Sequence, residues 1–234
     1  MMKKNMAIQS YLFSQLRYDI GIGWAINAFI CITFIILSFF IPEHVTLMVT
    51  PSAAIYIIVG VIGMKWIGRT LSYLLRLGVN RTQYSMGTIT FTLLYNLFNA
   101  VLVALFYFLI KFIDYLQLNT SMSFMHPVQL VTDNISFMSI VLFDFIVFTI
   151  ISFVTILLSI AYHRIGKLGG NLVLAIFAIL LVLNITFNGI ISMFKWLITL
   201  DSIIALLIGI LVIIGLAIGI YFATKRISIV KASI

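Results

Sequence analysis

The sequence is poor in charged residues. Asp, Glu, Lys and Arg make up 9% of its 234 positions, whereas 63% are hydrophobic and the mean hydropathy is +1.24. A soluble domain carries about 25% charged residues, because its surface must be wetted. The shortage of charge therefore excludes a water-soluble fold. We expect an integral membrane protein that has the lipid bilayer as its first partner.

Residues that usually mark catalytic or metal sites are also scarce. The single cysteine, Cys31, excludes a disulfide framework and a cysteine metal site. The three histidines are far apart, and no His-Glu-x-x-His pattern, phosphate-binding Gly-x-x-x-x-Gly-Lys-Ser/Thr loop or pair of intramembrane acids occurs. We therefore expect no enzyme activity, no metal and no cofactor in this chain, and no nucleotide bound by it.

Long uncharged runs are what the sequence has instead. A membrane-spanning helix needs about 20 mostly apolar residues. Six runs meet this length, at 20–42, 44–64, 82–110, 134–163, 168–194 and 202–224, and only the fourth contains a charged residue, Asp144. The sequence predicts an all-α polytopic membrane protein with six transmembrane helices in a single domain over 1–234.

The basic residues are distributed unevenly between the ends of these spans. With a cytoplasmic N-terminus, twelve of the fourteen Lys and Arg residues fall on the inner side and only Lys111 and Lys195 on the outer side. Cytoplasmic loops carry such an excess. We therefore place both termini in the cytoplasm. The net charge of +8 belongs to these loops, so nucleic acid is not an expected partner.

The segment before the first span has its own pattern. Ile8, Leu12 and Leu16 recur every four residues within 5–18, which is typical of an amphipathic helix. One interpretation is an interfacial helix lying on the inner membrane surface. The alternative is an ordinary helical extension of the first span.

Polar residues inside the spans form stripes. Asp144 is the only acid within the bilayer, and a carboxylate there should be protonated or paired and should face protein or water. No Lys or Arg lies at mid-membrane, so water or amides are its expected neighbours. The stripes predict a wettable translocation pathway lined by Asn96, Asn99, Asp144, Ser152, Thr155, Asn184 and Asn188, with Ser159 continuing the stripe. The alternative is that these groups only form interhelical hydrogen bonds.

The longest inner connection, 65–83, has a regular pattern of leucines and arginines. Its spacing places leucines 71, 74, 75 and 77 on one side of a helix and Arg69, Arg76 and Arg81 elsewhere, and Gly78 is placed to end that helix. We expect a short helix, a glycine turn and the entry of the next helix. A basic loop that only sets topology is the alternative.

The stretch "LLRLGVNRTQYSMG" resembles the first cytoplasmic loop of type-2 ABC (ATP-binding-cassette) exporter permeases. The resemblance implies that this loop holds a coupling helix, which docks on a separate ATPase subunit that binds ATP. It also implies short outer helices before the last span, which 188–200 could supply. The implied ATPase-coupling residues are Arg69, Leu74, Leu77, Gly78, Val79, Asn80 and Arg81.

These features predict a permease subunit of an ABC exporter in a bacterial cytoplasmic membrane, working with a second permease copy or a sister permease. The cargo would be hydrophobic or amphipathic, and the chain looks like a permease of a phenol-soluble-modulin exporter or a lantibiotic-immunity exporter. Two alternatives remain open: a substrate-capture subunit of an energy-coupling-factor vitamin importer, and a membrane immunity or scaffold protein without transport activity.

Overall fold

The computed structural model describes residues 2–38, 40, 47–50, 52–115, 122–130, 135–186 and 202–225. These residues are helical apart from short connections and two three-residue strands, β1 (Leu47–Val49) and β2 (Met122–Phe124), which pair in parallel. The helices are α1 (Met2–Ser38), α2 (Ala53–Arg76), α3 (Arg81–Tyr115), α4 (Phe137–Thr186) and α6 (Ser202–Lys225), with a 3-10 turn, η1 (Pro127–Leu130).

The helices fit a membrane in length and surface. In the described part, four are long and apolar enough to cross a bilayer, and α2 makes a fifth if its two bent halves form one span. Large apolar side chains point outward, such as Phe29, Ile57 and Leu211, each about two-thirds exposed or more. Lipid accepts such a surface and water does not. The chain is therefore a helical, multi-pass membrane protein.

The fifth predicted span, 168–194, is helical up to Thr186, where α4 ends. Its last residues, 187–194, and the whole predicted outer segment 188–200 lie outside the described residues. The count of six spans therefore stays a prediction.

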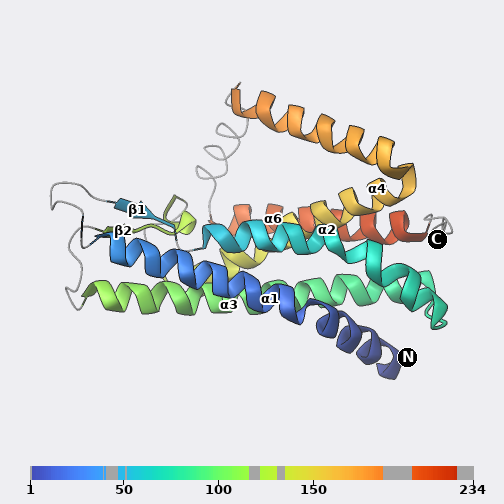
Figure 1. Cartoon of the computed structure of the whole chain (residues 1–234), viewed down its shortest axis with the longest axis horizontal. Helices are drawn as coiled ribbons and strands as arrows, with labels where there is room; N and C mark the ends of the chain where they lie inside the picture. Colours follow the sequence, from blue (N-terminus) through green and yellow to red (C-terminus); the bar gives the residue numbers. More distant parts are fainter. Residues whose placement is uncertain are drawn as a thin grey trace.

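The connections gather at two opposite ends of the bundle. The α2–α3 turn, the break within α4, the start of α1 and the end of α6 lie at one end, on the right in Figure 1. The strands and η1 lie at the other end. The first end carries the basic connections Lys65–Arg81 and Arg164–Lys167, and we call it the basic end. The predicted grouping of the connections is thus present.

The second span differs from its prediction. Helix α2 begins only at Ala53, and part of the uncharged run 44–64 forms β1 instead. Hydropathy alone did not show this, because a buried strand and a helix can have the same composition. The sequence before α2 does contain the relevant signals: β-branched residues, and Pro51, which disfavours helical backbone at the residue preceding it.

Helix α4 contains a sharp break at Gly166. This residue has φ of 80° and ψ of 178°, a conformation that is essentially restricted to glycine. Beyond it the chain turns back and runs apart from the other helices (Figure 1). The described part of α4 that packs in the bundle therefore ends at Gly166, close to the predicted end of the fourth span.

The N-terminal segment is the beginning of a longer helix. Residues 5–18 are helical, but α1 continues without interruption into the first span, with a bend in its first turns (Figure 1). Ile8, Leu12 and Leu16 are at most 6% exposed, since they pack against α2 and α3. The apolar face therefore packs against the bundle, and the continuity of α1 favours the alternative, a helical extension of the first span. A position on the inner membrane surface stays a prediction.

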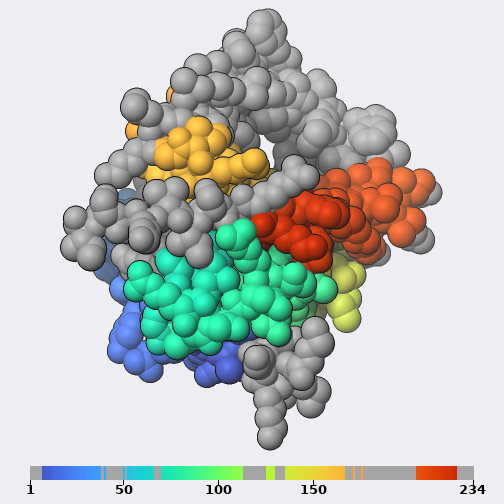
Figure 2. Space-filling model, turned by 90° about the vertical axis from the view of Figure 1, so that its right-hand side faces the viewer, coloured from blue at the N-terminus to red at the C-terminus, as the bar shows by residue number. Residues whose placement is uncertain are grey.

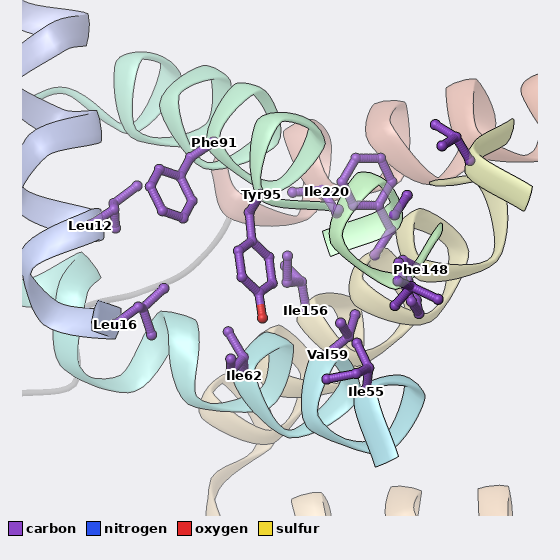
Figure 3. Close-up of a cluster of buried hydrophobic side chains, with 14 of the residues drawn as sticks. Leu12, Leu16, Ile55, Val59, Ile62, Phe91, Tyr95, Phe148, Ile156 and Ile220 are labelled. Atoms are coloured by element: carbon purple, nitrogen blue, oxygen red, sulfur yellow. The ribbon is translucent and has the colours of Figure 1, made fainter. Parts of the chain in front are cut away.

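The core lies where helices α1, α2, α3 and α4 meet. Figure 3 shows Tyr95 of α3 between Leu16 of α1, Ile62 of α2 and Ile156 of α4. Phe148 of α4 packs at the far side of the same cluster, with its ring 4.9 Å from that of Tyr56. These contacts hold α4 against both α2 and α3, which positions the polar groups described below.

The contact between α2 and α4 is close because of one glycine. A Cβ added at Gly63 would overlap Thr155 Oγ1 and approach the Ser152 carbonyl oxygen to 3.0 Å. The hydroxyl of Thr155 is bonded to backbone carbonyls of its own helix, so it cannot easily turn aside. Gly63 therefore sets the distance between the two helices.

We predict that Gly63→Ala destabilises the protein by about 1–3 kcal/mol, because the added methyl group forces α2 and α4 apart. The measurement is thermal unfolding in detergent micelles. Gly215→Ala is the matched control, since no atom lies within 4 Å of a Cβ at that glycine, and it should leave the midpoint unchanged. Adding Thr155→Ala, which removes the opposing side chain, should partly restore the stability that Gly63→Ala loses. Equal unfolding midpoints for Gly63→Ala and Gly215→Ala would contradict the role of Gly63 in spacing the two helices.

Candidate functional site

The turn between α2 and α3 is held by two backbone hydrogen bonds. Gly78 adopts φ of 80°, and its N–H donates to the carbonyl of Leu75 at 3.1 Å. The N–H of Val79 donates to the carbonyl of Leu74, also at 3.1 Å. This pair of bonds is the Schellman motif, in which glycine supplies the left-handed residue after the helix. The predicted role of Gly78 as the end of the helix is confirmed.

The next helix starts with an equally defined cap. Asn80 Oδ1 accepts a hydrogen bond from the N–H of Gln83 at 2.7 Å, and Gln83 Oε1 accepts one from the N–H of Asn80 at 3.2 Å. This reciprocal pair is a capping box, with Asn80 as its first residue. The four residues from Leu77 to Asn80 thus form a rigid corner between the two helices.

The last turns of α2 form a short helix that is set at an angle. Segment Thr70–Arg76 is bent by 42° from Ala53–Lys65. Leu71 and Leu74 are buried, and Thr70 shares a 2.8 Å hydrogen bond with Tyr84 of α3. The arrangement matches the predicted order of helix, glycine turn and helix.

Contacts with α1 hold the same segment from its other side. The ring of Tyr73 stacks on Tyr11 at 4.8 Å. Before the bend, Lys65 forms an ion pair with Asp19 of α1 at 3.0 Å. The bent end of α2 is therefore fixed to both α1 and α3, and a force applied to it reaches both helices.

Not all predicted coupling residues point away from the bundle. Leu74 is 3% exposed, and the Asn80 side chain is occupied by its cap. Leu77 is 63% exposed, so it does not share the buried leucine face to which its spacing assigned it. Val79 is partly buried, and Gly78 is exposed. The Arg69 side chain lies outside the described part of the structure. Three exposed residues of this helix were not among the predicted coupling residues: Ser72, Tyr73 and Arg76.

Arg81 has a partner within the chain. Its guanidinium donates from an Nη atom to the carbonyl of Lys225, the last residue of α6, at 2.9 Å. Free carbonyls at a helix C-terminus carry partial negative charge, which a guanidinium neutralises. Figure 2 looks onto the basic end and shows the α2–α3 turn bordering α6. Arg81 therefore ties the corner to α6.

A second polar centre lies at the other end of the bundle. Asp144 is 0% exposed, and its two carboxylate oxygens have different partners. The Tyr56 hydroxyl, from the first turn of α2, donates to Oδ1 at 2.5 Å. His126 Nε2 lies 3.1 Å from Oδ2. His126 belongs to the connection between β2 and η1, and it is also 0% exposed.

The hydrogen bonds define the tautomer of His126. The N–H of Val128 lies 3.2 Å from Nδ1 of the imidazole. A backbone N–H can only donate, so Nδ1 must present its lone pair, and the ring proton sits on Nε2. Nε2–H therefore donates to Asp144. The rings of Tyr107 and Phe143 lie edge-on to the imidazole, at 5.5 and 6.2 Å, and hold its plane.

This arrangement corrects the expected surroundings of Asp144. Its partners are a histidine and a tyrosine, and the predicted amides Asn96 and Asn99 bond elsewhere. The carboxylate also lies seven residues after the start of α4, about 10 Å along the helix, so it is near one end of the span rather than mid-way. Sequence spacing could not show that the α3–α4 connection folds back and brings His126 into the bundle.

The predicted polar stripe of α4 does face the neighbouring helices. Asn96 Nδ2 of α3 donates to Ser152 Oγ at 3.1 Å, with Thr149 Oγ1 at 3.5 Å. Ser159 Oγ donates to the carbonyl of Met64 in α2 at 2.8 Å, and Thr155 faces Gly63. These are interhelical hydrogen bonds, as in the alternative to a translocation pathway. They join α4 to α2 and α3.

The other predicted amides do not join this stripe. Asn99 Oδ1 accepts a hydrogen bond from the Trp24 indole at 3.0 Å, and its Nδ2 donates to the Tyr95 carbonyl at 3.0 Å. Asn99 therefore links α3 to α1. The side chain of Asn184 and the whole of Asn188 lie outside the described part. Trp24, Tyr56, His126 and Thr149 were missed by sequence reasoning, because their partners are distant along the chain.

The comparisons with known proteins are negative. No protein-family model matches the chain, and neither the curated proteins nor the solved structures contain a match. Within the described ranges, no group of three or more His, Cys, Asp or Glu residues is placed to hold a metal ion. The site must therefore be interpreted from its own geometry.

We predict that Asp144→Leu destabilises the protein by about 2–5 kcal/mol, since it leaves the buried Tyr56 hydroxyl and His126 Nε2–H without an acceptor. Asp144→Asn keeps an acceptor and the shape, so its cost should be smaller. Unfolding in detergent, monitored by circular dichroism, gives both values. Ser159→Ala removes a single hydrogen bond of the same helix and serves as the control; an Asp144→Leu midpoint equal to that of this control would contradict the assignment.

Proposed function

We propose that the chain is the permease subunit of an ABC exporter, energised by a separate ATPase that docks on the α2–α3 corner. The observation that carries the proposal is the bent helix Thr70–Arg76 with its rigid Schellman and capping-box corner. A connection that only set topology would need its arginines but no such fixed geometry.

The exposed face of this helix suits a protein partner. Tyr73, Leu77 and Gly78 offer an apolar patch, with the cationic Arg76 beside it, while Leu71 and Leu74 hold the helix to the bundle. Aromatic residues and arginine are enriched at the centres of protein interfaces. In this proposal, the face enters a groove of the ATPase.

The proposed orientation in the membrane follows from the position of the basic end. We propose that this end is cytoplasmic, with both termini inside and the helix beyond Gly166 continuing as a fifth span in a bacterial cytoplasmic membrane. The excess of Lys and Arg at this end supports the orientation. The permease would work with a second copy or a sister permease, and it would bind no cofactor of its own and no nucleic acid.

The proposed cargo is hydrophobic or amphipathic, which includes peptide toxins. The predicted pathway residues remain part of this proposal. In the observed conformation the stripe of α4 is closed by its own hydrogen bonds to α3. A route along it therefore requires α3 and α4 to separate, which would free Asn96 and Ser152 to contact cargo.

We predict that Leu77→Ser lowers co-purification with the partner ATPase about tenfold, because it removes the most exposed apolar side chain of the docking face. The assay is affinity capture of the partner ATPase, co-expressed with the permease. Ile165→Ser, at the same end and 55% exposed, is the matched control and should bind like wild type. Full binding by Leu77→Ser would place the ATPase contact elsewhere.

Arg81 is expected to act differently from Leu77. Because its guanidinium holds the end of α6, Arg81→Gln should leave ATPase binding within about twofold but lower permease-stimulated ATP hydrolysis, since movement of the corner no longer reaches α6. Arg81→Lys keeps a cation at the helix end and should retain most of the stimulation. Loss of binding in Arg81→Gln would show a direct contact with the ATPase, as the family resemblance implied.

A further inference from the structure

Helix α3 is longer than a bilayer is thick. It has 35 residues, and at 1.5 Å per residue it measures about 52 Å. The hydrocarbon layer is about 30 Å thick. A crossing of this layer from Thr82 to Lys111 would measure about 44 Å and need a tilt of about 45°, which is outside the range of membrane helices. Part of α3 therefore lies outside the hydrocarbon, and the charges on neighbouring helices show which part.

A layer of charged groups crosses α1 and α2 well before the basic end. Asp19 of α1 pairs with Lys65 of α2, and their side chains are 30% and 46% exposed. Arg17 is also exposed, and it donates to the Tyr18 hydroxyl at 3.1 Å with its guanidinium 4.8 Å from the ring centre. Exposed charges avoid hydrocarbon, and tyrosine is enriched where hydrocarbon meets the headgroups. This layer therefore has the composition of a membrane boundary.

The contact between α1 and α3 carries the same level to α3. The two helices run in the same direction (Figure 1), and Trp24 of α1 bonds to Asn99 of α3. Five residues earlier on each helix, Asp19 is level with Leu94. The stretch from Leu94 to the exposed Lys111 measures about 26 Å, which fits the hydrocarbon thickness without a large tilt.

Two further contacts carry the level to α4 and α6. Ser159 of α4 donates to the backbone carbonyl that precedes Lys65. A Cβ at Gly219 of α6 would lie 3.8 Å from Leu157 of α4, and both helices run toward the basic end (Figure 1). Two residues further along each helix, Tyr221 is level with Ser159. A tyrosine of α6 therefore lies at the same level as the charged layer.

We propose that phospholipid headgroups contact the bundle at this level, through an aromatic–basic belt formed by Arg17, Tyr18, Lys65, Tyr221 and Lys225. The Lys225 ammonium lies 4.7 Å from the centre of the Tyr221 ring, so α6 repeats the cation–aromatic pair of α1. Cations at such a boundary attract anionic lipid headgroups. The basic end then stands in water, about 20 Å beyond the belt when measured along the first turns of α3. This inference does not rest on the proposed transport function.

The parts on either side of the belt expose different side chains. Between the belt and the far end, the exposed large side chains of α1 and α3 are aliphatic or aromatic, including Ile22, Ile26, Phe29, Leu97, Phe98 and Phe112. Beyond the belt, α1 exposes Ser10, Ser14 and Gln15. Among the described side chains there, Phe13 of α1 and Met86 of α3 are the large apolar ones that are exposed. These two residues distinguish water from lipid in the test.

The test is spin labelling of the full chain in lipid nanodiscs. Power saturation compares collisions with oxygen, which concentrates in hydrocarbon, and with a water-soluble nickel chelate. Met86→Cys and Leu97→Cys form a matched pair, since these side chains are 54% and 44% exposed on the same helix. The ratio of nickel to oxygen collisions should be several-fold higher at 86 than at 97, and a ratio cancels differences in steric access. Wild type, with its buried Cys31, gives the blank.

Hydropathy alone predicts the opposite result, because the uncharged run 82–110 includes Met86 in the span. A ratio at Met86→Cys as low as that at Leu97→Cys would overturn the proposal. If Met86→Cys does not fold, α1 gives the same comparison. Phe13→Cys should have a high ratio and Ile26→Cys a low one, from side chains that are 59% and 47% exposed. A low ratio at Phe13→Cys would place the start of α1 in lipid and would also overturn the proposal.

Discussion

Hydrocarbon offers no partner for a hydrogen bond, so a polar side chain inside this bundle is stabilised when it finds a partner within the chain. Helix α4 carries four buried polar residues that bond to its neighbours or to its own backbone, namely Asp144, Thr149, Ser152 and Ser159. Asp144 bonds to Tyr56 and His126, Ser152 bonds to Asn96, and Ser159 bonds to the α2 backbone. This requirement fixes which side of α4 meets α2 and α3, and the position of the other helices follows from it.

The two ends of the bundle are built on different principles. At the basic end, backbone bonds around Gly78 and Asn80 make a rigid corner, and Arg81 ties that corner to α6. At the opposite end, one buried imidazole lies between a carboxylate and a backbone N–H. Backbone geometry therefore holds the first end, and a buried side-chain network holds the second.

Several features could be predicted from residues alone because they are local. The turn at Gly78 follows from the conformational freedom of glycine, and the inward face of Asp144, Ser152 and Ser159 follows from helical spacing. The helix over 5–18 was likewise predicted, but its apolar face was assigned to the membrane. Spacing shows that Ile8, Leu12 and Leu16 share a face, and it does not show whether lipid or another helix covers that face.

Composition and short-range pattern, by themselves, determined that this is a helical membrane protein with basic connections grouped at one end and a capped corner before α3. Only the tertiary structure decided the partners: Tyr56 and His126 for Asp144, Lys225 for Arg81, and Thr155 for Gly63. The physical reason is sequence separation. Each of these pairs except His126 with Asp144 joins residues more than 80 positions apart, and His126 meets Asp144 only because its connection folds back into the bundle.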